Sequence, residues 1–165
     1  MLKDKIVLVP GSSRGIGAAT ARLAKEYGAE VILHGKEESD ELKAFAEELG
    51  SRYVVCDVAD EIAVKTAIQS IEKIDVLVNC AGISISKSFT EASDEDWLTI
   101  FKVNVLGTVH FCKAVIPLMQ KNEQGRIVNI ASIRGYGTTS GSPAYSSSKA
   151  AIINLTATLA KEYAP

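Results

Sequence analysis

Tyr145 and Lys149 place a phenol and an ammonium group four residues apart in the sequence. Ser142-Pro143 stands just before them and predicts the start of a helix, because proline suits the first helical position. On such a helix the two side chains share one face, one turn apart. A neighbouring cation favours the phenolate form of a tyrosine. The pair can therefore give and take a proton, which is the chemistry of a general acid or base.

A second group of residues is suited to binding a phosphate. The segment Gly11-Ser12-Ser13-Arg14-Gly15-Ile16-Gly17 directly follows the apolar run Ile6-Val7-Leu8-Val9 and its neighbour Pro10. Apolar residues then recur at helical spacing until Gly28. A glycine-rich turn thus joins a buried strand to a helix N-terminus, whose free N–H groups stabilise a pyrophosphate. The spacing G-x-x-x-G-x-G differs from the common dinucleotide fingerprint, and a plain tight turn is the alternative.

The elements that must position these groups alternate between strands and helices. Apolar runs at 31–33, 53–56, 76–78 and 126–130 predict further strands, separated by amphipathic helical patterns, the longest at about 94–119. This alternation predicts a Rossmann-like, doubly wound α/β fold with a parallel sheet in strand order 3-2-1-4-5. Right-handed crossovers bring the ends of strands one, four and five to one edge. The glycine loop, Asn79 to Gly82 and Ser132 follow those ends.

Short motifs follow one another along the whole chain: Gly11-x-x-x-Gly15-x-Gly17, Asp57 after the third strand, Asn79-Cys80-Ala81-Gly82 after the fourth, Asn104 in the long helix, Ser132 after the fifth, and Tyr145 with Lys149. In this order and spacing they resemble the short-chain dehydrogenase/reductase family, of the kind typified by bacterial 3-oxoacyl-acyl-carrier-protein reductases. The resemblance runs from about residue 3 to residue 165. It implies an oxidoreductase that moves hydride between a nicotinamide cofactor and a carbonyl or alcohol substrate.

The resemblance also implies a role for each motif residue. Ser132 would hydrogen-bond the substrate carbonyl oxygen, and Tyr145 would protonate that oxygen. Lys149 would hold the ribose hydroxyls and keep the phenol acidic, and Asn104 would bind a water linking Lys149 to solvent. Asp57 would meet the adenine amino group. Further cofactor contacts are implied for the glycine loop and for the segments after strands three and four: Gly11, Ser13, Arg14, Gly15, Ile16, Gly17, Val58, Asn79, Ala81 and Gly82.

Structural roles remain open for several of these residues. Ser132 could be an ordinary loop serine, and Asn104 a buried helix amide bonded to nearby backbone. Asp57 could cap the turn that follows it, and Asn79 could fasten its loop to a neighbouring strand. Arg14 could be a solvated loop cation.

The end of the second strand bears on the choice between NAD and NADP. An acidic residue there would bond the ribose 2′-hydroxyl and repel a 2′-phosphate, but the segment is His34-Gly35-Lys36. Lys36 and Arg14 could together hold a 2′-phosphate by charge-assisted hydrogen bonds. NADP(H) is therefore the predicted cofactor. His34 is expected to face solvent at the strand end. No metal site is predicted, because the two histidines and the cysteines lack ligand spacing.

Composition suits a cytoplasmic enzyme with one domain over residues 1–165. Of the 165 residues 47% are hydrophobic, and the net charge of −2 gives no broad basic surface for nucleic acid. Cys56, Cys80 and Cys112 are predicted to be free thiols in a reducing compartment. The start at Met1 leads straight into the first strand, and no apolar run approaches the roughly 20 residues of a membrane span, so neither a signal peptide nor a membrane segment is expected.

The chain departs from the family pattern in three places. Pro10 stands where a threonine is usual, and Cys80 replaces the commoner second asparagine of its motif. Family members usually continue for about 80 residues beyond the Lys149 helix, so this chain is expected to be a catalytic domain incomplete at its C-terminal end. Two alternatives to a 3-oxoacyl thioester reductase stay open. One is a non-catalytic nucleotide-binding fragment or module, and the other is a sugar-nucleotide epimerase, which the glycine spacing disfavours. A homo-oligomer through the long helices is expected.

Overall fold

The computed structural model describes residues 1–137 and 140–163, and in this part of the chain a parallel five-stranded sheet forms the centre. The sheet order is β3-β2-β1-β4-β5, as predicted. The strands are β1 (Ile6–Val9), β2 (Glu30–Gly35), β3 (Arg52–Val55), β4 (Val76–Asn79) and β5 (Arg126–Asn129). Each pairs in parallel with its neighbour; Leu8, for example, lies opposite Ile32 on one side and Leu77 on the other. The predicted Rossmann-like α/β fold is confirmed.

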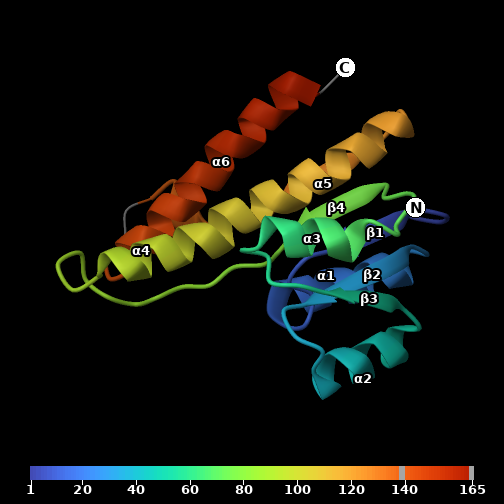
Figure 1. The fold of residues 1–165 in the computed structure, drawn as a ribbon, viewed down its shortest axis with the longest axis horizontal. Coiled ribbons are helices and arrows are strands. Elements are labelled where there is room, and N and C mark those ends of the chain that lie inside the picture. The colour runs from blue at the N-terminus through green and yellow to red at the C-terminus, as the bar shows by residue number, and fades with distance from the viewer. Residues whose placement is uncertain (138–139, 164–165) are drawn as a thin grey trace.

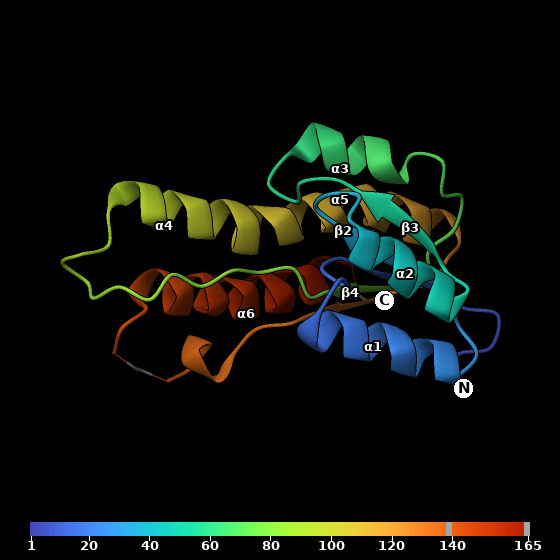
Figure 2. The same ribbon diagram turned by 90° about the horizontal axis from the view of Figure 1, so that it is seen from below.

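Helices cover both faces of the sheet (Figures 1 and 2). The helices α1 (Gly15–Glu26) and α2 (Asp40–Leu49) lie on one face, and α3 (Glu61–Ile68) and α5 (Gly107–Lys121) lie on the other. Successive side chains of each strand point to opposite faces of the sheet. Val7 and Val9 pack in the core under α1 and α2, whereas Leu8 packs with Phe111 and Val115 of α5. The short apolar strands are thus buried on both faces, as parallel strands require.

The helix boundaries follow local sequence signals. Gly50 ends α2 in the left-handed conformation at φ 51°, which a residue without Cβ adopts at little cost. Asp60 caps α3, because its Oδ1 accepts hydrogen bonds from the N–H groups of Ile62 and Ala63 at 2.9 and 3.0 Å. The last helix, α6 (Pro143–Tyr163), begins at Pro143, as predicted.

The long helix predicted near 94–119 is interrupted by a wider turn. It consists of α4 (Asp94–Phe101), a π-helical turn over Lys102–Leu106 and α5. By length and composition the stretch Asp94–Lys121 could cross a membrane, contrary to the expectation from its sequence. Half of its most apolar window is buried inside the protein, however, as is usual for a core helix of a globular domain. The apolar character of this helix is therefore explained by packing against the sheet.

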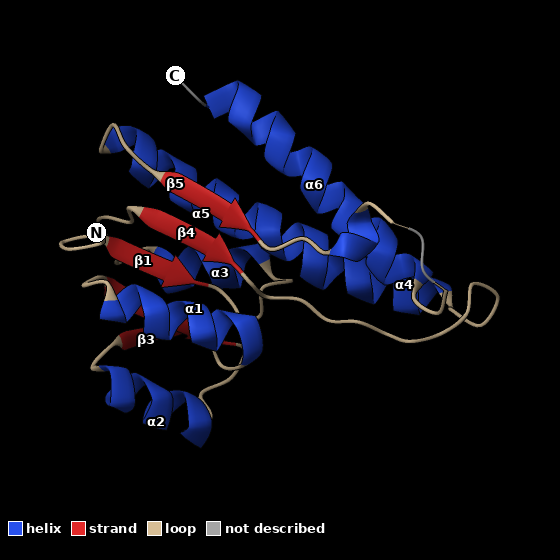
Figure 3. Cartoon of the chain, turned by 180° about the vertical axis from the view of Figure 1, so that it is seen from behind, coloured by secondary structure: helices blue, strands red, loops and turns tan. Residues whose placement is uncertain are grey.

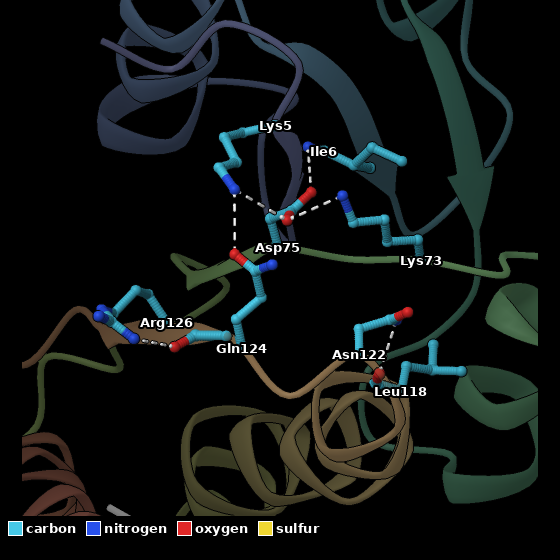
Figure 4. A network of polar contacts seen from close by, with 9 residues as sticks. Lys5, Ile6, Lys73, Asp75, Leu118, Asn122, Gln124 and Arg126 are labelled. Atoms are coloured by element: carbon cyan, nitrogen blue, oxygen red, sulfur yellow. Dashed lines mark hydrogen bonds and ion pairs between the residues drawn. The ribbon is translucent and has the colours of Figure 1, made fainter. Parts of the chain in front are cut away.

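A buried carboxylate joins the amino ends of β1 and β4, at the edge opposite the glycine loop. Asp75 is 4% exposed and accepts a hydrogen bond from the backbone N–H of Ile6 at 2.9 Å (Figure 4). Its Oδ1 lies 3.2 Å from Lys73 Nζ and 3.5 Å from Lys5 Nζ, and Lys5 also donates to Gln124 at 3.1 Å. Burial alone would raise the pKa of Asp75, but the Ile6 N–H and Lys73 outweigh it and lower the pKa. The charged group therefore fastens the strands rather than forming an open site.

Candidate active site

The predicted functional segments lie at one edge of the sheet. The arrowheads of β1, β4 and β5 point the same way, and the loops that follow them leave on the same side (Figure 3). The start of α6 and the α4 end of the long helix extend beyond that edge. This is the edge at which doubly wound sheets bind their ligands.

The glycine loop after β1 has the backbone that its sequence predicts. Gly11 and Gly15 adopt positive φ angles of 80° and 58°. A Cβ on Gly11 would lie 2.6 Å from the Cα of Ala81, and a Cβ on Gly17 would overlap the carbonyl oxygen of Gly11. A Cβ on Gly15, by contrast, would meet no atom of the described residues within 4 Å. Three further residues of the predicted contact set are exposed on the loop: Ser13, Arg14 and Ile16.

The open side of this loop fits a phosphate group. Helix α1 begins at Gly15, and Arg14 at its N-cap makes no side-chain hydrogen bond to the first turn. The N–H groups of that turn are therefore available to an anion, whose charge the helix dipole also stabilises. The glycine loop would hold the pyrophosphate of a dinucleotide here.

Lys149 is a buried cation at the end of β5. Its side chain is 5% exposed, and its Nζ donates a 2.7 Å hydrogen bond to the carbonyl of Ile130, the residue after β5. Nζ lies 5.8 Å from the ring centre of Tyr145, which is half-buried on the same helix face. Burial lowers the pKa of Lys149, and the neighbouring Cys80 acts in the opposite direction. The Lys149 ammonium group and the Tyr145 ring thus lie one helix turn apart on the same face of α6.

Asn104 lies in the π-helical turn and is completely buried. Its Oδ1 accepts a hydrogen bond from the N–H of Ile83 at 2.8 Å, and its Nδ2 donates to the carbonyl of Ile83 at 3.0 Å. Nδ2 also donates to Ser148 Oγ at 3.0 Å, and Ser148 in turn donates to the carbonyl of Tyr145 at 2.7 Å. The backbone contacts match the structural alternative for Asn104. The link through Ser148 to the Tyr145 helix was not predicted from the sequence.

Ser132 begins the turn that follows β5. Its Oγ accepts a hydrogen bond from the N–H of Arg134 at 3.2 Å, so it caps the 3₁₀ turn Ile133–Gly135. Among the described residues Ser132 makes no hydrogen bond to Tyr145. Gly135 of the same turn packs against the backbone of Lys149, where an added Cβ would lie 2.9 Å from the Lys149 carbonyl carbon. The serine turn and the Tyr145 helix are therefore in contact through backbone.

Lys36 and Asp57 were predicted to contact different parts of the cofactor, but they form an ion pair. Lys36 Nζ lies 3.0 Å from Asp57 Oδ2, and both side chains are exposed. Asp57 also accepts the N–H of Ala59 at 2.9 Å, which caps the turn as the alternative proposed. The hydrogen bond from Ala59 is the main cause of the lowered pKa of Asp57, with Lys36 adding to it. Hydrogen bonding and attraction to Asp57 raise the pKa of Lys36.

Two other predicted cofactor residues are committed to packing. The side chain of Val58 is buried against Gly107, and its carbonyl accepts a hydrogen bond from His110 Nδ1 at 2.9 Å. Asn79 is 4% exposed and donates to Asn129 Oδ1 on β5 at 2.8 Å. Asn129 donates in turn to Thr156 of α6 at 2.9 Å. Asn79 thus fastens β4 to β5, although its own Oδ1 has no hydrogen-bond partner among the described residues. Gly82 lies beside Asn104 and Lys149, since an added Cβ would lie 3.3 Å from Asn104 Oδ1 and 3.5 Å from Lys149 Nζ.

The expectation that His34 faces solvent is wrong. The imidazole is 2% exposed and lies between the glycine loop and the end of β3.

The three cysteines are free thiols, as predicted. Within residues 1–137 and 140–163, no three His, Cys, Asp or Glu side chains gather closely enough to hold a metal ion.

Comparison with known proteins identifies the family. The family model for short chain dehydrogenases matches residues 5–165, and the chain belongs to this family of oxidoreductases. An uncharacterized oxidoreductase of Staphylococcus epidermidis is 36% identical over 99% of this chain and 73% of its own length. One of Staphylococcus aureus is 37% identical over 99% of the chain and 74% of its own length.

Solved structures agree with the fold. A gluconate 5-dehydrogenase from Burkholderia cenocepacia, in complex with NADP and tartrate, superposes with a TM-score of 0.95 at 29% identity. It is matched over 99% of this chain and 67% of its own. A protein described as a candidate betaketoacyl-ACP reductase superposes with a TM-score of 0.93 at 31% identity, over 99% of this chain and 69% of its own.

Proposed function

We propose that this chain provides the NADP(H)-binding and catalytic residues of a carbonyl reductase that acts on 3-oxoacyl thioesters. The observation that carries the proposal is the buried Lys149 ammonium group beside Tyr145, held at the sheet edge that also carries the glycine loop. The buried ammonium group would stabilise the negative charge left on the phenol when its proton moves to the substrate.

Each residue of the site would act on one part of the reaction. The bound nicotinamide supplies the hydride. Tyr145 gives its proton to the substrate carbonyl oxygen, and Ser132 holds that oxygen by a hydrogen bond. For this, Ser132 Oγ donates to the substrate while it accepts the Arg134 N–H. Lys149 stabilises the phenolate left on Tyr145, and Asn104 fixes their helix through Ser148.

The preference for NADP(H) is assigned to Lys36. Its ammonium group is exposed after β2, and Gly35 before it carries no side chain that could compete for a 2′-phosphate. The gluconate 5-dehydrogenase that this chain resembles is in complex with NADP, which supports the assignment.

A substitution at Lys36 tests this cofactor preference. Lys36→Gln should weaken NADPH binding about tenfold and leave NADH binding unchanged, because only NADPH carries the phosphate. Lys43→Gln, which removes an exposed cation from α2, is the control. Equal affinity of the unmodified protein for the two cofactors would contradict the assignment.

The substrate is tested by following NADPH oxidation with acetoacetyl thioesters. Tyr145→Phe should lower kcat by about 10²–10⁴-fold, while Tyr27→Phe, at the far end of α1, should have no effect. A keto acid such as 5-ketogluconate is the second candidate substrate, because a gluconate 5-dehydrogenase is among the similar structures. Tight NADPH binding without turnover of either compound would support the non-catalytic module instead.

We also propose that the protein forms a homo-oligomer through its long helices. Leu98 of α4 and Leu106 of the π-helical turn are 59% and 44% exposed, which supports contact with a second copy. Sedimentation at micromolar concentration should detect the oligomer, and a monomer at all concentrations would refute this proposal.

A further inference from the structure

A buried imidazole lies between the two halves of the proposed dinucleotide site. His34 is the fifth residue of β2, and its Nδ1 accepts a hydrogen bond from the N–H of Gly11 at 3.1 Å. Its Nε2 lies 3.0 Å from the carbonyl oxygen of Cys56, the residue before Asp57. The backbone of His34 is also bound by Ser12, because the His34 N–H donates a hydrogen bond to Ser12 Oγ at 2.8 Å. One residue therefore joins the glycine loop, β2 and the end of β3.

The two ring contacts define one protonation state. Gly11 contributes an N–H and can only donate, so Nδ1 must carry a lone pair. The Cys56 carbonyl can only accept, so Nε2 must carry the proton. The neutral ring protonated at Nε2 satisfies both neighbours, whereas a ring protonated at Nδ1 would face the Gly11 N–H with a second proton. The burial of the ring favours the same neutral form.

Gly11 has little freedom to move on its other sides. Ala81 lies so close that a Cβ on Gly11 would be 2.6 Å from its Cα, and the Gly11 carbonyl packs directly against Gly17. A shift of Gly11 is therefore transmitted to the first turn of α1, where the pyrophosphate would bind. The contact with Cys56 places the other ring nitrogen next to Asp57, on the proposed adenine side.

We propose that His34 is a positioning residue for cofactor binding: its imidazole fixes the glycine loop relative to the end of β3, and this spacing sets the affinity for the dinucleotide. The inference rests on the proposed NADP(H) site. This role differs from that of a residue that only fills the core, because an apolar side chain of similar size would fill the space but leave the Gly11 N–H without a partner.

Two variants separate the two hydrogen bonds of the ring. In His34→Asn the amide oxygen stands two bonds from Cβ, as Nδ1 does, so the acceptor for Gly11 is kept and the donor to Cys56 is lost. In His34→Gln the amide stands three bonds from Cβ, as Nε2 does, so the donor is kept and the acceptor is lost. Each variant loses one bond, and the two are matched controls for general destabilisation.

The experiment measures the unliganded protein and the cofactor complex separately. Amide hydrogen exchange should show Gly11 protected in the unmodified protein and in His34→Asn, and exchanging about tenfold faster or more in His34→Gln. Dissociation constants for NADPH and for 2′,5′-ADP should rise about tenfold in His34→Gln and less than about threefold in His34→Asn.

The outcomes distinguish this inference from the proposed function. Equal dissociation constants for the two variants, with the unmodified protein binding NADPH tightly, would overturn the positioning role alone. Failure of the unmodified protein to bind NADPH or NADH would overturn the proposed function and, with it, the positioning role. A further measurement needs no variant: ¹⁵N chemical shifts of His34 at pH 7 should show Nδ1 unprotonated, and a proton on Nδ1 would refute the proposed contact.

Discussion

The fold should lose stability as the pH falls below 6.5, because His34 is buried without charge. Burial lowers the pKa of His34 from 6.5 to about 4, against the smaller raising effects of its hydrogen bond to Cys56 and of nearby Asp57. Cys56 and Asp57 are the titratable groups that face the ring, and Lys36 pairs with Asp57. The apolar ring of Phe111 stands perpendicular to the imidazole, with the ring centres 5.4 Å apart.

The sign and size of the effect follow from proton binding in the two states. Below pH 6.5 the unfolded chain binds a proton at this histidine, whereas the folded protein does not until the pH approaches 4. Folding stability is therefore lost as the pH falls through this window. The loss is close to zero at pH 7 and about 2 kcal/mol at pH 5 for these two pKa values.

Urea unfolding of the unmodified protein and of His34→Asn, each at pH 7 and at pH 5, isolates this contribution. The variant lacks the titrating ring, while all other ionisable groups are common to both proteins. Only the unmodified protein loses stability through this histidine as the pH falls. The difference in free energy of unfolding between the unmodified protein and the less stable variant should therefore shrink by about 2 kcal/mol between pH 7 and pH 5. Two parallel stability profiles would show that His34 is not held neutral by the fold, and the reasoning from burial would fail.

Other substitutions give equally direct tests. Asp75→Ala should lower the free energy of unfolding by about 2 kcal/mol, because it leaves the part-buried N–H of Ile6 without an acceptor, and Asp75→Asn should cost less; equal losses in urea titrations would argue against the hydrogen bond. Gly17→Ala should lower the free energy of unfolding more than Gly15→Ala, since the former overlaps the Gly11 carbonyl oxygen and the latter meets only the backbone strain of its positive φ, and urea titration compares the two. In Tyr145→Phe the dissociation constant for NADPH should stay within about threefold of that of the unmodified protein while kcat falls; parallel changes in both would indicate a structural role.

The strands, their order and the glycine loop could be predicted because their signals are local. Four apolar residues followed by spaced glycines specify a buried strand and a tight turn wherever they occur, and Gly50 or Asp60 fixes a helix end within a few residues. Parallel connections then leave few possible strand orders. These parts of the fold depend on chain connectivity rather than on distant contacts.

The remaining features depend on partners far apart in the sequence. The burial of His34 arises from Gly11 and Cys56, each more than twenty positions away, and a single histidine at a strand end gives no sign of them. The pairing of Lys36 with Asp57 likewise joins the ends of two strands. Side-chain periodicity also gives no signal for the π-helical turn, because its apolar positions continue the pattern of the long helix. The position of a polar side chain within the site is therefore harder to predict than the site's location.

The wide turn at Lys102–Leu106 limits changes in chain length at this point. It holds one residue beyond the α-helical count, and each residue turns a helix by about 100°. Deletion of any one of these residues would permit an uninterrupted α-helix and would swing α4 by that angle relative to α5. Trp97, whose ring meets Phe89 edge-on at 6.5 Å, would then point elsewhere, and the amide of Asn104 would no longer meet Ile83. Insertions and deletions in related sequences should therefore avoid this turn, while the exposed loop before α4 tolerates them.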